Sequence, residues 1–161
     1  MWVTHALVTY VTVDRALGHR SALLAALGSL LPDLDHPNPL AARLILRPLE
    51  RATGVRIRGA VHARLGHRGP LHFPWPWLLG TLLLWQHHRD LSLLVLGGLL
   101  HVLQDALTAR GIPVLPGRDG WIRVALTPIP GRWWDRVLVP ASALVLLTTA
   151  GRRAGSVTIW G

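Results

Sequence analysis

The chain has 161 residues, enough for a single domain with a core of its own, and it contains no cysteine, which excludes disulfide bonds and thiolate metal sites. Its net charge is +9, carried by 17 arginines without a lysine against eight acidic residues, and half of its residues are hydrophobic. This balance favours an anionic partner, either a membrane surface or a nucleic acid, although the absence of lysine also indicates a compositional bias towards arginine. The mean hydropathy of +0.36 favours the membrane.

The N-terminal part of the chain is predicted to be helical with one long loop. Residues 2–13 are apolar with interspersed threonines and fit a helix or a strand, whereas residues 20–31 fit a helix that stops at Pro32. Residues 38–48 form a short amphipathic segment compatible with a helix, and the Arg-, Gly- and His-rich residues 51–70 are predicted to be a loop. The N-terminus lacks a positively charged region, so no signal peptide is expected.

The middle of the chain predicts a pair of helices. Residues 76–86 and 91–108 are apolar and fit two helices, separated by a polar turn at residues 86–90. The second helix is expected to end before Gly111, because glycine commonly follows a helix C-terminus.

The C-terminal part completes a mostly helical pattern. Residues 112–134 are predicted to be a Pro- and Gly-rich loop with short strands, and residues 135–150 fit a final helix with Pro140 in its first turns. No apolar run reaches the roughly 20 residues that cross a bilayer comfortably. We therefore expect an all-α, single-domain helical bundle with long loops that associates with a membrane. Residues 1–115 and residues 116–161, which add the loop and the C-terminal apolar helix, are expected to belong to the same domain.

The pair His101 and Asp105 is the sharpest chemical signal. A spacing of four on a helix places both side chains on one face, where an imidazole nitrogen and a carboxylate oxygen can bind one cation. The alternative is a structural pair, with the histidine hydrogen-bonded to the aspartate inside an apolar core.

The segment GHRGPLH at residues 66–72 is the second candidate. Its glycines allow a tight turn that brings His67 and His72 to a shared metal, and Arg68 between them has the fork geometry that binds phosphate. The alternative is an exposed basic loop.

The segment PDLDHP at residues 32–37 places two carboxylates close together. Between its prolines the chain is expected to be nearly extended, so that Asp33 and Asp35 point the same way and repel each other unless a cation lies between them. The alternative is a helix cap in a solvated turn. His5 stands alone in an apolar stretch and would by itself be a core histidine.

Taken together, these segments offer nitrogen and oxygen donors for two or three cations. Zinc suits a histidine-rich set best, and manganese or iron would also suit it.

The same motifs occur in an order that resembles a known family. They are Thr4-His5, GSLLPDLDHP at 28–37, GHRGPLH at 66–72 and HVLQDALTARGIPV at 101–114. In this order and spacing they resemble the YdjM-like family of predicted membrane-bound, metal-dependent hydrolases over roughly residues 1–115. The resemblance implies a fold related to zinc-dependent bacterial phospholipase C and its nuclease relatives, which are all-α enzymes that cleave phosphodiesters with a zinc cluster.

The resemblance also implies a set of ligands. Carried over by motif, the metal ligands are His5, Asp33, Asp35, His67, His72, His101 and Asp105. His36 matches the family pattern as well, as a residue that supports the ligands. Two features depart from the pattern: Leu71 and Phe73 replace the hydroxyl residues that usually flank this loop histidine, and the region after Pro116 is short.

The implied activity is hydrolysis of a phosphoester, such as a phospholipid or a lipid-linked phosphate, by metal-activated water at the inner membrane of a bacterium or archaeon. Asp33 or Asp35 would hold or deprotonate the water, and Arg68 would bind a phosphate oxygen. Two alternatives are a non-catalytic membrane protein with a structural His/Asp metal site and a basic nucleic-acid-binding module. The arginines are spread from Arg15 to Arg153 rather than forming one stripe, which disfavours the nucleic acid.

Overall fold

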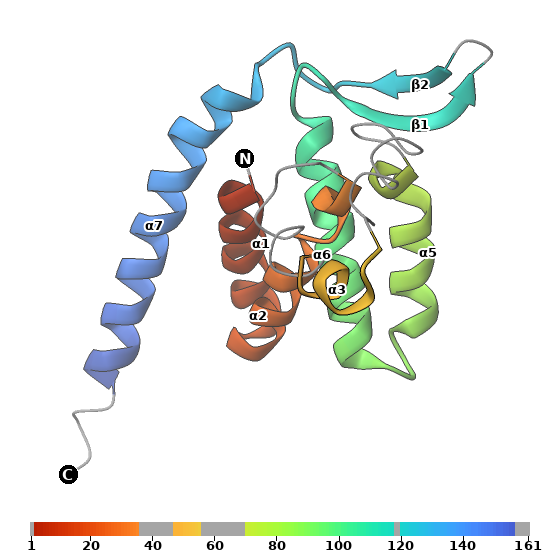
Figure 1. Cartoon of the computed structure of the whole chain (residues 1–161). Helices are drawn as coiled ribbons and strands as arrows, with labels where there is room; N and C mark the ends of the chain where they lie inside the picture. The colour runs from red at the N-terminus through yellow and green to blue at the C-terminus, as the bar shows by residue number, and fades with distance from the viewer. Residues whose placement is uncertain (1, 36–46, 56–69, 118–119, 157–161) are drawn as a thin grey trace.

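The computed structural model describes residues 2–35, 47–55, 70–117 and 120–156. Four helices form its body: α1 (Trp2–Leu17), α2 (His19–Gly28), α5 (Pro74–Leu84) and α6 (Arg89–Ala106). The helix α6 lies at the centre of this bundle, packed against α2 on one side and α5 on the other, and α1 packs against α2 (Figure 1). The predicted all-α bundle is confirmed, and residues 2–13, which fitted a helix or a strand, are helical.

The remaining elements are short, apart from the C-terminal helix. They are the 3-10 turns η1 (Pro32–Asp35) and η3 (Pro70–His72), the helix α3 (Arg47–Thr53), the strands β1 (Ile112–Gly117) and β2 (Gly120–Val124), and the helix α7 (Gly131–Ser156). The two strands form an antiparallel hairpin at one end of the bundle, and α7 packs along α1 (Figure 1).

Three predicted boundaries were wrong. The helix α6 begins at Arg89, inside the predicted polar turn, and α3 extends to Thr53, inside the predicted loop. The helix α7 begins at Gly131, so Pro140 lies in its interior rather than in its first turns. A proline inside a helix lacks the N–H for one backbone bond, yet the surrounding apolar run continues the helix. The segment predicted at residues 38–48 lies mostly outside the described residues.

Glycines allow α6 to approach its neighbours closely. A Cβ atom at Gly28 would lie 1.9 Å from the carbonyl oxygen of Leu94, and one at Gly97 would lie 1.9 Å from the carbonyl oxygen of Ala25. Because real Cβ atoms do not approach this closely, only glycine fits at these two positions where α2 meets α6. This contact sets the position of α2 along the axis of α6, and with it the position of the η1 turn that follows α2.

Residues that follow the hairpin form hydrogen bonds with the C-terminal end of α6. The backbone N–H of Leu126 donates to the carbonyl oxygen of Ala106 at 2.7 Å. The hydroxyl of Thr127 and the indole N–H of Trp134 both donate to the carbonyl oxygen of Leu107, each at 2.7 Å. These donors satisfy carbonyl groups that a helix end leaves without partners.

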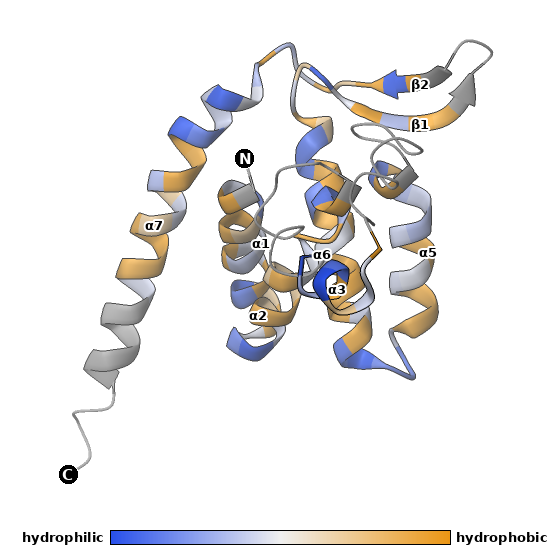
Figure 2. Ribbon diagram, viewed as in Figure 1, coloured by the Kyte–Doolittle hydropathy of each residue, from blue (hydrophilic) through white to orange (hydrophobic). Residues whose placement is uncertain are grey.

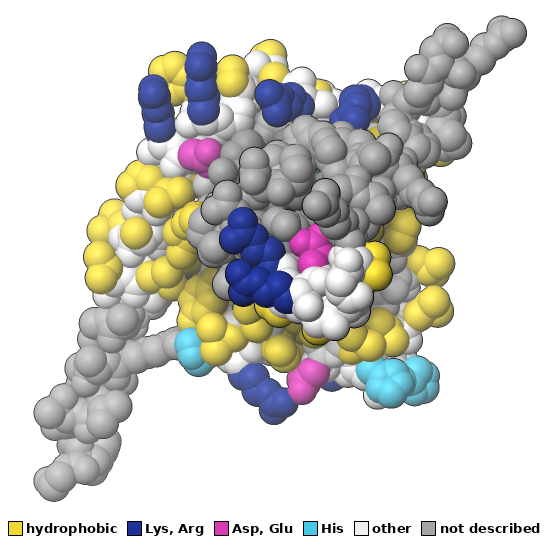
Figure 3. All heavy atoms as spheres, viewed as in Figure 1, with side chains coloured by type: hydrophobic (Ala, Val, Ile, Leu, Met, Phe, Trp, Pro, Cys, Tyr) yellow, Lys and Arg dark blue, Asp and Glu magenta, His cyan; other side chains and the backbone are white. Residues whose placement is uncertain are grey.

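The distribution of polarity is the reverse of that in most soluble domains. Among the described residues, buried polar side chains outnumber buried hydrophobic ones. Large hydrophobic side chains are exposed instead, and those of α5 and α7 include Leu79, Leu82, Leu83, Val137, Leu144 and Leu147. Figure 2 shows hydrophobic residues along both helices, and Figure 3 shows hydrophobic side chains on the surface over them, with arginines gathered at the end where α7 begins. Among the described residues, no helix combines the length and hydropathy needed to cross a membrane.

Candidate metal centre

Five of the predicted ligands converge at the hairpin end of the bundle. His5 comes from the first turns of α1, Asp33 from η1 and His72 from η3, while His101 and Asp105 both come from the last turns of α6. Their donor atoms form two groups that share His101, and within each group the atoms lie within 4.8 Å of one another. Segments far apart in the sequence therefore present nitrogen and oxygen donors to one small volume.

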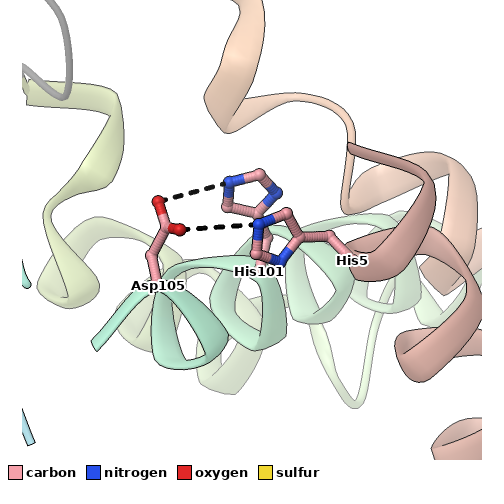
Figure 4. Close-up of side chains that lie close together, drawn as sticks. All are labelled: His5, His101 and Asp105. Atoms are coloured by element: carbon pink, nitrogen blue, oxygen red, sulfur yellow. Dashed lines mark ion pairs between the residues drawn. The ribbon is translucent and has the colours of Figure 1, made fainter. Parts of the chain in front are cut away.

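The first group consists of His5, His101 and Asp105. Nε2 of His5 lies 3.5 Å from Oδ1 of Asp105, and Nε2 of His101 lies 3.8 Å from Oδ2 of the same carboxylate. Figure 4 shows both imidazole rings lying side by side, with these nitrogens directed at the carboxylate. The ring centroids are 4.0 Å apart. The predicted convergence of His101 and Asp105 on one helix face is thus present.

The second group consists of Asp33, His72 and His101. Oδ1 of Asp33 lies 3.9 Å from Nε2 of His72 and 3.7 Å from Nε2 of His101. The two groups are joined a second time by Asp105, because its Oδ2 lies 3.5 Å from Nε2 of His72. The five side chains therefore form one continuous cluster rather than two separate pairs.

Hydrogen bonds on the far side of two rings determine their tautomers. Nδ1 of His101 lies 2.6 Å from the carbonyl oxygen of Ser29, and Nδ1 of His5 lies 3.3 Å from Oε1 of Gln104. An oxygen acceptor requires a hydrogen on each Nδ1, so in the neutral ring the lone pair is on Nε2. Gln104 is itself oriented, because its Nε2 donates to the hydroxyl of Thr9 at 3.0 Å. Both histidines therefore present a lone pair to the cluster.

Burial keeps the central imidazole neutral. Loss of solvent is the main cause that holds the pKa of His101 well below its usual 6.5, and the nearby ring of His5 acts in the same direction. The charge of Asp105 raises the pKa but does not outweigh these effects. A neutral imidazole is the form that binds a metal ion.

The cluster is closed on most sides. The side chains of His72, His101, His5 and Asp105 are at most 4% exposed, whereas that of Asp33 is 19% exposed. Asp33 is thus the member of the described cluster that meets solvent.

The predicted conformation around Asp33 and Asp35 was wrong. Residues 32–35 form a 3-10 turn, not an extended segment, because the turns that end α2 continue through the hydrogen bond from the N–H of Leu34 to the carbonyl oxygen of Leu31. Pro32 is compatible with the first position of such a turn, where no N–H bond is needed. With about three residues per turn, the backbone here lacks the two-residue repeat on which the prediction of two carboxylates pointing the same way rested.

Several predicted site residues cannot be placed. The side chain of Asp35 and all of His36, His67 and Arg68 lie outside the described residues.

Some residues of the site were not among the sequence predictions. Gln104 and the carbonyl oxygen of Ser29 orient two imidazoles, and Thr9 orients Gln104. One signal was available, since Thr9 lies four residues after His5, one helical turn away on the same face of α1. The role of the Ser29 carbonyl oxygen could not be predicted from the sequence, because every residue has a backbone carbonyl.

Comparisons with known proteins identify a family and relatives to which the chain is similar. The family described as "YdjM inner membrane protein" matches residues 1–160. The inner membrane protein YdjM of Escherichia coli K12 is 37% identical over 127 residues, as is the protein of the same name from Shigella flexneri. Each match covers 73% of this chain but only 60% of the relative's length. No solved structure matches the chain.

Proposed function

Since this chain belongs to the YdjM family of inner membrane proteins, and is therefore membrane-associated, we propose that it is a metal-dependent hydrolase of phosphoesters. The proposal rests on the buried cluster of three histidines and two aspartates at the hairpin end of the bundle. Its substrate is a phospholipid or another lipid-linked phosphate.

One observation supports the proposal that the cluster binds a metal ion. Among the described atoms, Nε2 of His101 is buried without a hydrogen-bond partner, and it faces the carboxylates of Asp33 and Asp105. Because Nδ1 carries the hydrogen, Nε2 directs a lone pair at two carboxylate oxygens, and this arrangement is unfavourable in a buried site. With a cation bound, His101, Asp33 and Asp105 would serve as its ligands, and the repulsion between their electron pairs would be relieved.

The donor set fits zinc. Ligands about 2.0–2.2 Å from a tetrahedral zinc ion lie roughly 3.3–3.6 Å apart, and the nitrogen–oxygen distances of the cluster are 3.5–3.9 Å. Each group offers three protein ligands, the number that catalytic zinc sites use, with a fourth position left for water or substrate. Mixed imidazole and carboxylate ligation would also accept manganese or iron.

The residues of the cluster have distinct roles in this proposal. When bound, the metal supplies Lewis acidity and lowers the pKa of water towards neutrality. His5, His72, His101 and Asp105 hold it and, being buried, exclude bulk solvent from the site. Asp33, as the more exposed carboxylate, would hold the metal through one oxygen and accept the proton of the attacking water with the other.

The surface of the molecule supports a lipid-borne substrate. Leu82 on α5 is 65% exposed and Leu147 on α7 is 73% exposed, as expected for helix faces that contact lipid. Trp75 and Trp133 are half-exposed near the N-terminal ends of the same two helices, and tryptophan is enriched at membrane–water interfaces. The metal cluster lies at this end of the bundle, close to the depth where phosphate headgroups would lie.

Metal content and activity of the purified protein test the proposal together. In detergent, the wild type is expected to retain zinc by elemental analysis and to hydrolyse the model diester bis(p-nitrophenyl) phosphate. His101→Gln should lose zinc and activity, whereas His88→Gln, an exposed histidine at the start of α6, should keep both. A wild type that neither retains zinc nor binds it on addition would refute the proposal.

The two alternatives give different results in the same assays. A structural metal site predicts zinc that depends on His101 without any hydrolysis of phosphoesters. A nucleic-acid-binding module predicts binding that falls steeply with salt and does not depend on zinc.

A further inference from the structure

A pocket of about 460 Å³ lies between the end of α6, which carries Asp105, and the start of α7. Its lining includes Arg110, Arg132, Thr108 and Asp135. We propose that this pocket binds the phosphate group of the substrate. This inference rests on the proposed hydrolase function and assigns the phosphate-binding role to described residues other than Arg68.

Two residues that line the pocket are hydrogen-bonded to segments that carry cluster residues. Thr108 lies one turn beyond Asp105, and its hydroxyl donates to the carbonyl oxygen of Asp105 at 2.8 Å. On the opposite wall, Asp135 accepts a hydrogen bond from the hydroxyl of Thr4, the residue that precedes His5. A group seated in the pocket would therefore lie next to two of the segments that carry ligands.

The charge of the pocket favours an anion. Arg110 and Arg132 are both exposed, and within the described part of the chain neither takes part in an ion pair. The pocket also includes Gly131, the first residue of α7, where the helix dipole adds partial positive charge. Among the described lining residues Asp135 is the single carboxylate, and the two guanidinium groups outweigh its charge.

A phosphate group suits these donors better than a simple halide or carboxylate would. A guanidinium binds two phosphate oxygens with parallel N–H groups, and two arginines together can hold three oxygens of a tetrahedral anion. The volume exceeds that of one phosphate, which leaves room for the part of the substrate attached to it. Figure 3 shows arginines gathered at this end of the molecule, where an anionic headgroup would approach.

Binding of inorganic phosphate to the metal-free protein tests the pocket alone. The protein is stripped of metal with a chelator, exchanged into phosphate-free detergent buffer and titrated with phosphate by calorimetry. We expect Arg110→Gln and Arg132→Gln each to weaken binding about 10- to 100-fold, as loss of a charged hydrogen-bond donor does. The matched control is Arg20→Gln, whose side chain is 83% exposed and pairs with Asp90 at the other end of the bundle. Absent binding, or equal losses in all three variants, would overturn the assignment.

Two further arms separate the possible results. Phosphatidylglycerol in mixed micelles that displaces phosphate from the wild type would assign the pocket to a lipid headgroup, whereas no displacement would assign it to a soluble phosphoester. Loss of phosphate binding in the arginine variants, in a protein that binds no zinc, would support the pocket while refuting the hydrolase. Normal zinc content and hydrolysis in both arginine variants, with KM unchanged, would refute the pocket while leaving the hydrolase intact.

Discussion

Replacing Gly97 by alanine tests whether the close contact of α2 and α6 holds the metal cluster together. The added Cβ atom would lie 1.9 Å from the carbonyl oxygen of Ala25, whereas ordinary contacts begin at 3.4 Å, so the helices must separate by about 1.5 Å. The same movement would lengthen the 2.6 Å contact between Nδ1 of His101 and the carbonyl oxygen of Ser29 beyond hydrogen-bonding range.

The expected loss of stability combines both effects. Forcing an extra methyl group into a packed contact costs about 1–3 kcal/mol, and leaving a buried hydrogen-bond partner unsatisfied costs about 1–3 kcal/mol. We therefore expect the free energy of unfolding of Gly97→Ala to fall by about 2–6 kcal/mol. Because His101 would lose its orientation, zinc affinity should also fall about 10- to 100-fold.

Urea unfolding in detergent, followed by circular dichroism, measures the change. The matched control is Gly80→Ala on α5, where among the described residues the new Cβ would meet one side-chain methyl group of Val95, at 3.0 Å, and no backbone atom. This control should stay within about 1 kcal/mol of the wild type, since alanine also favours a helix. If Gly97→Ala unfolds at the same urea concentration as Gly80→Ala and retains zinc, the packing argument is wrong.

Three other outcomes are expected. Gln104→Leu should weaken zinc binding about 10- to 100-fold by releasing an imidazole, while Gln86→Leu in the turn after α5 should not; competition with a zinc-sensitive dye measures both affinities. In metal-free protein, burial lowers the pKa of His101, so as the pH falls the unfolded state binds a proton before the folded state does. At pH values below about 6.5 the free energy of unfolding should therefore decrease, by up to ~1.4 kcal/mol per pH unit. Urea titrations at pH 8, 6 and 5 measure this decrease. Leu82→Glu should reduce the membrane-bound fraction after fractionation, because burying a carboxylate in lipid costs about 2–3 kcal/mol, whereas Leu49→Glu on α3, at a position that is also exposed, should leave it unchanged.

Much of the helical fold was predictable because its signals are local. The apolar run that ends at Pro32 and the run that ends before Gly111 both set helix boundaries within a few residues. The start of α7 was missed because its first turn is rich in Trp and Arg, and its position depends on contacts with α6 and α1. The high mean hydropathy of the sequence favoured a membrane protein with hydrophobic side chains on its surface. Which helix faces expose these side chains depends on the packing of the helices.

The candidate site was predictable in its residue types and less so in its geometry. The spacing of His101 and Asp105 placed them together because helical periodicity alone determines it. The conformation of residues 32–35 was mispredicted because flanking prolines fit both an extended segment and a 3-10 turn, and the hydrogen bonds that continue α2 decide between them. The metal-binding activity of the cluster stays a prediction until metal content is measured.

The hydrogen bonds between the end of α6 and the residues after the hairpin have a consequence for C-terminal truncations of this protein. A fragment that ends at residue 115 keeps all the His and Asp motifs, yet it lacks Leu126, Thr127 and Trp134, which donate to the carbonyl groups at the end of α6. The turn that carries Asp105 would then fray into solvent. Truncation to the motif-bearing region should therefore abolish metal retention, although it deletes none of the residues placed in the cluster.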